Sequence, residues 1–217
     1  RLAAFMAGAA PAFLVDVGST TTDIVPIGGA GPAPLATDDA GRMRSGELVY
    51  TGIERTPVPA LVRTLPHDGV RRPVASERFA DSRDAWLLLG ELAEDEGARD
   101  TADGGPATRA AARVRMARSM LLDPDCLSLE QAREAAARCA AAQARLVAHA
   151  LRRVAHGCGW RPGSIVLSGH GAALARMALD RVGWPVEHVH LAKRLGATVA
   201  RVGPAHALAL IARGELA

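Results

Sequence analysis

The stretch AFLVDVGSTTTDIVPI, residues 12–27, decides the fold of this 217-residue chain. Its first six residues are an apolar run broken only by one aspartate, which is typical of a strand buried on both faces. The small and polar residues 18–22 interrupt that run, and residues 23–27 read as a second strand. The stretch therefore predicts two strands joined by a tight bend, with Asp16 before the bend and Asp23 after it.

The bend has the residue types of a phosphate-binding loop. Backbone amides in a tight bend can converge on phosphate oxygens, and a glycine lets the main chain approach the ligand because it has no Cβ. The two aspartates are suited to Mg²⁺, a hard cation that takes oxygen ligands and keeps several waters. A Walker-A loop is excluded because the bend contains no Gly-Lys pair and feeds no helix. The predicted phosphate-binding residues are Gly18, Ser19, Thr20, Thr21 and Thr22. A threonine-rich hairpin whose aspartates only cap turns is the alternative.

Outward from the bend, the pattern predicts one α/β domain over residues 1–217, with helices flanking a sheet. A helix end is expected before residue 12, and residues 35–60 mix extended pieces with turns. Ser128-Leu-Glu-Gln131 is a capping box, and Gly157 is the expected residue after the end of that long helix. Other helices are expected at 81–89, 108–122, 172–181 and after 191, and strands at 164–167 and 186–191. Arginines 109, 113, 115 and 118 are expected on a solvated helix face.

A second glycine turn, Ser168-Gly-His-Gly171, follows the strand expected at 164–167 and leads into a helix. Amides at the start of a helix can bind a phosphate or an adenosine. Gly169 and Gly171 are therefore candidate phosphate-binding residues. A glycine turn that is needed for close packing is the alternative.

Composition argues against several other classes of protein. Lys and Arg number 26 against 23 Asp and Glu, and only 3% of residues are aromatic, so a basic face with stacking rings for nucleic acid is not expected. No run of 18 apolar residues is present, so no membrane segment is expected. The three cysteines contain no CxxC pair and leave an odd one over, which favours a reducing, cytoplasmic location.

Five segments carry a resemblance to known proteins: residues 16–27, Ser45-Gly-Glu-Leu-Val-Tyr-Thr-Gly-Ile-Glu-Arg-Thr-Pro-Val58, Phe79 with 84–92, Thr101-Ala-Asp-Gly104 and Ser168-Gly-His-Gly-Ala172. They resemble the hydantoinase A and oxoprolinase relatives of the sugar kinase/heat-shock protein/actin superfamily. More narrowly, the chain is similar to the hydantoinase-A-like family linked to tetrahydromethanopterin-dependent one-carbon metabolism, whose archaeal members are the coupling enzyme of methanofuran (methylofuran) biosynthesis. The second segment is the most family-specific, since the first indicates only the superfamily.

The resemblance implies an actin-like ATPase (ribonuclease H-like) lobe with a mixed sheet. It also implies a transferase that joins an aminomethyl-furan-methyl diphosphate to the phenol oxygen of a tyramine or tyrosine unit, releasing diphosphate and forming an aryl ether. Asp16 and Asp23 would hold Mg²⁺ while the bend binds diphosphate, which neutralises the leaving group. Arg55 would grip phosphate with two donors, a surface salt bridge being its alternative. Either Glu47 or Asp103 would accept the phenol proton.

Members of that family carry an additional N-terminal lobe that opens with its own Asp-x-Gly-Gly loop. This chain has only the second loop, so it resembles the second phosphate-loop lobe of a two-lobed enzyme and the N-terminal lobe is expected to be missing. Small-molecule diphosphate and phenolic substrates are the expected partners, together with a homo-oligomer or a separate N-terminal lobe. Two alternatives stay open: an ATP-dependent hydantoinase/oxoprolinase-type hydrolase or kinase lobe, and a non-catalytic actin-like binding module.

Overall fold

The computed structural model describes residues 11–196 and 198–199 and contains two compact units. Unit 1 takes the chain up to Tyr50 and from Arg145 on, and unit 2 is Thr51–Ala144. Unit 2, a contiguous segment with its own core, separates the two halves of unit 1 in the sequence, and the single domain predicted over residues 1–217 stays a prediction. The helix end expected before residue 12 and most of the C-terminal helical segment lie outside the described residues.

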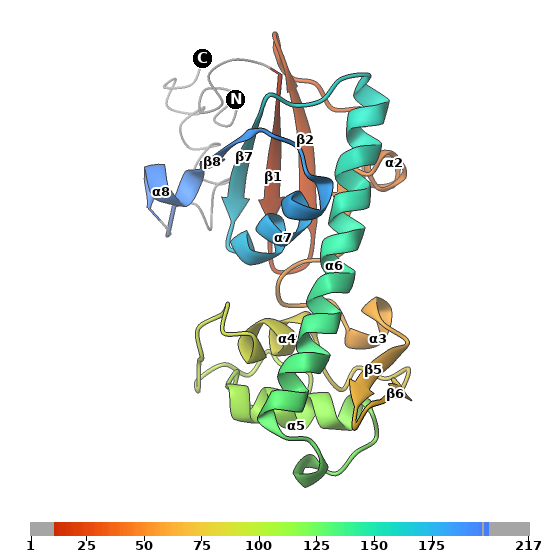
Figure 1. Cartoon of the computed structure of the whole chain (residues 1–217). Coiled ribbons are helices and arrows are strands. Elements are labelled where there is room, and N and C mark those ends of the chain that lie inside the picture. The colour runs from red at the N-terminus through yellow and green to blue at the C-terminus, as the bar shows by residue number, and fades with distance from the viewer. Residues whose placement is uncertain (1–10, 197, 200–217) are drawn as a thin grey trace. The chain divides into compact units, whose positions relative to one another are not determined.

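Unit 1 is built on a mixed six-stranded sheet with flanking helices, as the sequence predicted (Figure 1). The first strand pairs antiparallel with the second and parallel with β7, and β8 continues the parallel part. Two short strands pair with the free side of β2. The strands are β1 (Ala12–Val17), β2 (Thr22–Gly28), β3 (Gly31–Pro32), β4 (Leu48–Val49), β7 (Ser164–Gly169) and β8 (Glu187–His190). The predicted strand–bend–strand at residues 12–27 is confirmed.

Among the described residues of unit 1, three short helices and part of a long one accompany this sheet. The sequence did not predict α2, which begins because the Asp38 carboxylate accepts from the Gly41 amide at 2.9 Å. They are α2 (Asp39–Ser45), α7 (Ala172–Val182) and α8 (Leu191–Leu195), with the second half of α6 (Leu129–Cys158).

The long helix α6 begins as predicted and ends later than predicted. The amide of Ser128 donates to Gln131 Oε1 and the amide of Gln131 to Ser128 Oγ, which is the expected capping box. Gly157 was expected just past the end but lies inside the helix, where the absence of a Cβ lets Leu35 Cδ1 pack on it. Gly159 instead takes the positive φ, +73°, that turns the chain out of the helix.

Unit 2 packs three helices and the first half of α6 around an apolar core beside a hairpin. The hairpin falls in a region for which the sequence predicted nothing definite. Its elements are α3 (Val58–Leu61), β5 (Thr64–His67), β6 (Val70–Pro73), α4 (Ser82–Leu88), α5 (Arg109–Ser119) and a 3₁₀ turn at Pro124–Cys126.

One prediction for unit 2 is wrong: Arg115 does not lie on a solvated face. Its side chain is fully buried, and the guanidinium lies 2.7 Å from Asp84 Oδ1 and 3.0 Å from Asp103 Oδ1. Arg113 also turns inward and donates to the carbonyls of Pro124 and Leu127. The arginine spacing in α5 could not predict these contacts. The carboxylates that offset the cost of burying Arg115 belong to other segments of the chain.

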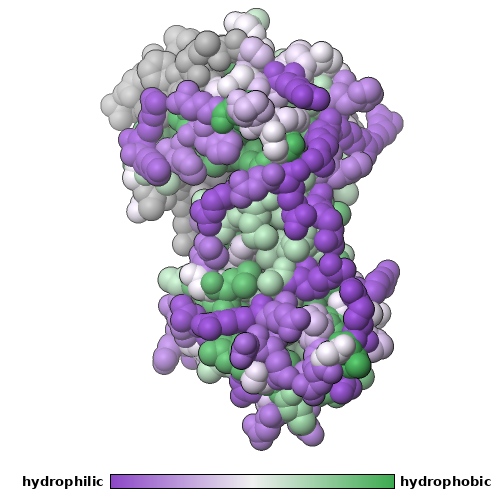
Figure 2. Space-filling model, in the orientation of Figure 1, coloured by the Kyte–Doolittle hydropathy of each residue, from purple (hydrophilic) through white to green (hydrophobic). Residues whose placement is uncertain are grey.

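The visible surface of each unit is largely hydrophilic (Figure 2), and the sequence contains no long apolar run. Figure 2 shows hydrophilic side chains over much of the visible face of each unit. Within the described part of the chain, no helix combines the length and the apolar content needed to cross a membrane. All three cysteines are free thiols, with Cys139 buried and Cys126 exposed.

Candidate functional site

The candidate site lies in unit 1, at the edge where β1 and β7 end. These strands are parallel neighbours, so their carboxyl ends and the loops that follow them meet at the same edge. Asp16 is paired with Asp23 across β2 and with Ser168 across β7. Residues that face one another across neighbouring strands point to the same side, so three oxygen-bearing side chains share one face of the sheet there.

The bend after β1 is a tight turn around Ser19 and Thr20. The amide of Gly18 donates to the Thr21 carbonyl at 2.9 Å, so this amide is used inside the turn. Within the described part of the chain, the amides of Ser19, Thr20 and Thr21 donate to no backbone carbonyl. Thr22 is a buried residue of β2. Of the predicted phosphate-binding residues, the three in the turn are thus the ones with amides open to a ligand.

The surroundings of Asp16 disfavour the ionised form of its carboxyl group. Burial is the main cause that raises its pKa, and the neighbouring charge of Asp23 raises it further. A hydrogen bond with Ser168 and the nearness of His170 oppose this rise without cancelling it. The site therefore contains a partly desolvated negative charge that a cation would stabilise.

Asp23 already has a cationic partner, which the sequence did not predict. Arg42 of α2 places Nη2 at 2.5 Å from Asp23 Oδ1, and Thr21 Oγ1 donates to Asp23 Oδ2 at 3.4 Å. Nothing in the residues around Arg42 indicates this pairing. It joins the start of β2 to α2, and the sequence did not predict that helix.

The side chains at this site could supply only part of the oxygen ligands of Mg²⁺, so water or substrate oxygens would have to supply the others. Among the described residues, no group of three or more His, Cys, Asp or Glu could hold a metal. Asp16 and Asp23 remain, with the Ser168 hydroxyl beside them. Mg²⁺ is commonly held by one or two carboxylates, waters and substrate phosphates, so this pair suits a magnesium diphosphate.

The glycines of the second turn are required by packing. A Cβ on Gly169, whose φ is +78°, would lie 2.2 Å from the Val17 carbonyl oxygen and 2.6 Å from Asp16 Oδ1. A Cβ on Gly171 would lie 2.1 Å from Val17 Cγ1, and the Gly171 amide donates to the Val17 carbonyl at 3.1 Å. The close-packing alternative thus accounts for both glycines, and a phosphate role for them stays a prediction.

Glu47 has a structural role in unit 1, because its carboxylate accepts hydrogen bonds from two separate segments. Its side chain is buried and accepts from the amides of Leu35 at 2.7 Å and Ala36 at 3.1 Å, and from the Ser45 hydroxyl at 2.7 Å. These contacts fix the segment before α2 to the end of that helix. Both carboxylate oxygens are occupied, so the predicted role as acceptor of the phenol proton has no support from its surroundings.

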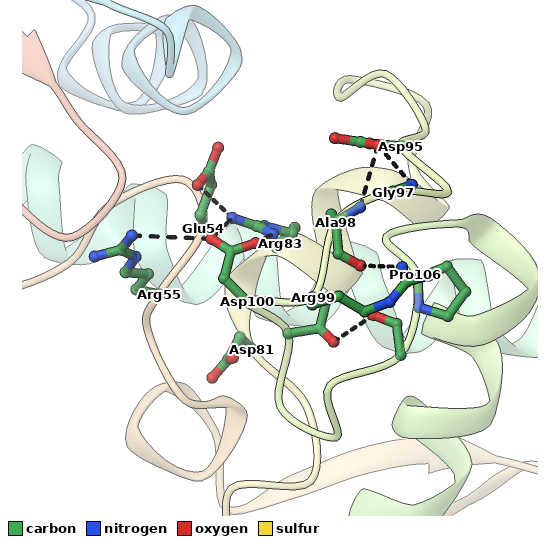
Figure 3. A network of polar contacts seen from close by, with 12 residues as sticks. Glu54, Arg55, Asp81, Arg83, Asp95, Gly97, Ala98, Arg99, Asp100 and Pro106 are labelled. Carbon is green, nitrogen blue, oxygen red and sulfur yellow. Dashed lines mark hydrogen bonds and ion pairs between the residues drawn. The ribbon is translucent and has the colours of Figure 1, made fainter.

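Arg55 and Asp103 belong to unit 2. Figure 3 shows Arg55 beside Asp100, with Nη2 and Oδ2 3.8 Å apart. Asp100 is itself gripped by Arg83 at 2.5 and 2.8 Å, and Arg83 also binds Glu54 at 2.6 Å. The guanidinium of Arg55 is about half exposed, and its pairing matches the salt-bridge alternative.

Asp103 has a lowered pKa. Burial opposes its ionisation, but the Gly105 amide and the charge of Arg115 outweigh that effect. A carboxylate held in this way is a weak proton acceptor, so the choice between Glu47 and Asp103 stays open.

Comparison with known proteins gives two relatives with the same name, and no family model matches the chain. A protein of Methanococcus vannielii named (4-{4-[2-(gamma-L-glutamylamino)ethyl]phenoxymethyl}furan-2-yl)methanamine synthase is 29% identical over 205 residues, which are 94% of this chain and 91% of that protein. The protein of that name from Methanocaldococcus jannaschii is 36% identical over 110 residues, which are 51% of this chain and 33% of that protein.

Proposed function

We propose that this chain takes part in forming the aryl ether of a furan-containing one-carbon cofactor of the methanofuran type. The similarity over 94% of the chain to a named synthase carries this proposal. That name describes a product in which a phenol oxygen is joined through a methylene group to a furan that bears an aminomethyl group. The bond to be made is therefore a carbon–oxygen bond between a furan-methyl carbon and a phenol.

The reaction that fits is displacement of diphosphate. The bond between the furan-methyl carbon and the ester oxygen breaks, and diphosphate leaves with the electron pair. The phenol oxygen then bonds to that carbon and gives up its proton to a base, for which Glu47 and Asp103 stay the two candidates. Because the furan ring stabilises positive charge on the methyl carbon, the main task of the protein is to stabilise the leaving anion.

The edge of β1 and β7 offers groups for that task. The amides of Ser19, Thr20 and Thr21 would donate to diphosphate oxygens. Asp16 and Asp23 would hold Mg²⁺, whose charge would neutralise the diphosphate. Arg42 would hold Asp23 in place, since it binds one oxygen of that carboxylate. The phosphate-binding role that the sequence predicts for Arg55, which belongs to unit 2, stays a prediction.

We also assign unit 1 to the actin-like lobe of the hydantoinase-A-like resemblance. What supports the assignment is the pair of antiparallel strands with a glycine-threonine turn, placed beside a parallel strand that leads into a helix through a second turn. The two turns lie at one sheet edge, as a phosphate site that uses both would require.

The proposal is tested by following free diphosphate by phosphorus NMR when the full chain is incubated with a furan-methyl diphosphate and γ-glutamyl-tyramine. Diphosphate and ether are expected to appear in equal amounts and to require Mg²⁺. Asp16→Asn is expected to lower the rate at least about a hundredfold, because it removes one carboxylate of the proposed ion site.

The matched control is Asp180→Asn, an exposed aspartate of α7 in the same unit, which should leave the rate unchanged. Release of ADP from ATP without consumption of the diphosphate ester would favour the hydrolase or kinase alternative. Turnover of neither substrate, with Asp16→Asn behaving as the parent, would leave the non-catalytic binding module.

A further inference from the structure

Unit 1 contains a pocket that the proposed reaction does not use. It has a volume of about 530 Å³, within the range of small-molecule sites. It lies at the C-terminal ends of α6 and α7, two helices labelled in Figure 1. The lining residues are Arg152, Ala155, His156, Gly159, Trp160, Arg161, Val182, Gly183 and Trp184.

The pocket is separate from the site at the strand ends. Its indoles pack on Phe13, which lies four residues before Val17, or about 13 Å at roughly 3.3 Å per residue of strand. Phe13 and Asp16 are an odd number of residues apart in β1, so their side chains lie on opposite faces of the sheet. A ligand in this pocket could not contact Asp16.

Trp160 and Trp184 line one part of the pocket, and both pack on the same phenylalanine ring. The ring of Phe13, which is fully buried, has its centroid 5.3 Å from that of Trp160 and 6.1 Å from that of Trp184. Tilted and edge-on packing at these distances is favourable, so Phe13 anchors both indoles. The whole chain has only three tryptophans, and two of them meet here.

The polar side chains of the pocket favour an anion. Two arginines and a histidine line it, and none of its lining residues within the described part of the chain is acidic. Arg152 is held in place because its Nη2 donates to the Arg181 carbonyl at the end of α7, 2.5 Å away. Arg161 is exposed on the loop after α6. Guanidinium groups bind carboxylate and phosphate oxygens with two donors and also stack on aromatic rings.

We propose that this pocket is a second small-molecule site, selective for an aromatic ring that bears a carboxylate or phosphate group. The indoles of Trp160 and Trp184 contact the ring, and Arg161 with Arg152 binds the anionic group. The proposal does not depend on the proposed ether-forming reaction, because it rests on residues at the opposite end of the sheet.

The test uses the full chain labelled with ¹⁵N, whose tryptophans give three indole N–H signals. Phenyl phosphate and 4-hydroxyphenylacetate are titrated separately, and their affinities show which anionic group is preferred. The signals of Trp160 and Trp184, assigned with Trp→Phe variants, are expected to shift and saturate. Trp86 is the internal control, because its indole donates to Gln143 Oε1 at 2.8 Å in unit 2 and should not shift.

Variants and ring-less probes make the test decisive. Arg161→Ala is expected to weaken binding at least about tenfold, because it removes a charge-assisted hydrogen bond. Arg145→Ala removes an exposed arginine of α6 outside the pocket and should leave the affinity unchanged. Inorganic phosphate and acetate are expected to bind at least about tenfold more weakly than the aromatic probes. The proposal is overturned if neither aromatic probe shifts the two indoles, if the ring-less anions bind equally well, or if both arginine variants behave alike.

Discussion

At the scale of single residues, the candidate site combines a carboxylate whose ionised form is disfavoured with a glycine that packing does not require. Asp16 is partly buried beside a second carboxylate, and this raises its pKa. A Cβ on Gly18 would meet only the Thr21 carbonyl oxygen at 3.6 Å, an ordinary contact, and Gly18 has no positive φ. Packing therefore does not require a glycine at residue 18, and both features agree with the proposed binding of a ligand there.

Asp16→Asn is expected to stabilise the protein at neutral pH by about 1 kcal/mol, although the same variant is expected to lower the rate of ether formation at least about a hundredfold. A raised carboxyl pKa means that folding favours the protonated form, so the parent loses stability as the pH rises from the ordinary value of 3.8 through the raised pKa. The excess stability of the variant should therefore be present at pH 7 and vanish below about pH 3.8. Urea unfolding across this pH range measures it, and a variant less stable than the parent at pH 7 would contradict the account.

Gly18→Ala is expected to fold with a free energy of unfolding within about 1 kcal/mol of the parent. Its turnover of the diphosphate ester should fall at least about tenfold, because the new methyl group stands where the ligand approaches the main chain. Thermal unfolding and steady-state kinetics on the same samples separate the two effects. Unchanged kinetics would remove the turn from the proposed diphosphate site.

At the scale of elements, the start of α7 is locked to the end of β1. The amide of Gly171 donates to the Val17 carbonyl, and no room exists for a side chain on Gly171 against Val17. This contact fixes the second turn beside the first, so the edge that presents Asp16 is held by backbone packing and does not depend on a ligand.

Gly171→Ala is expected to destabilise unit 1 by about 3 kcal/mol, because its methyl group would lie 2.1 Å from Val17 Cγ1. Gly183→Ala, at the other end of α7, is the matched control. Gly183 has open space around it and a φ of +71°, so only the cost of a left-handed conformation of about 1–2 kcal/mol is expected. Urea unfolding of both variants compares them, and equal losses would mean that the contact with Val17 is not the cause.

At the scale of the whole molecule, each of the two units has buried hydrophobic residues of its own. In unit 2, Arg115 is fully buried with Asp84, and Trp86 binds Gln143 of α6. In unit 1, the aromatic cluster contains Trp160 and Trp184. Each unit thus has its own tryptophan reporters.

Arg115→Ala is expected to destabilise unit 2 by about 3–5 kcal/mol, because it leaves the carboxylate of Asp84 buried without its partner. On heating, the indole N–H signal of Trp86 should be lost at a lower temperature than those of Trp160 and Trp184. Arg145→Ala serves as the control and should leave the order of loss as in the parent. Simultaneous loss of all three signals in the Arg115 variant would show that the units unfold as one.

Local chemistry in the sequence determined the strand–bend–strand at residues 12–27 and the start of α6 at its capping box, because each depends on residues close together in the chain. The same chemistry selected Asp16, Asp23 and the turn between them. Only the tertiary structure brought Arg42 to Asp23, fitted Gly171 against Val17 and buried Arg115 with Asp84. These contacts join distant segments, and the free energy of burying a charge or removing a side chain depends on what the fold places beside it.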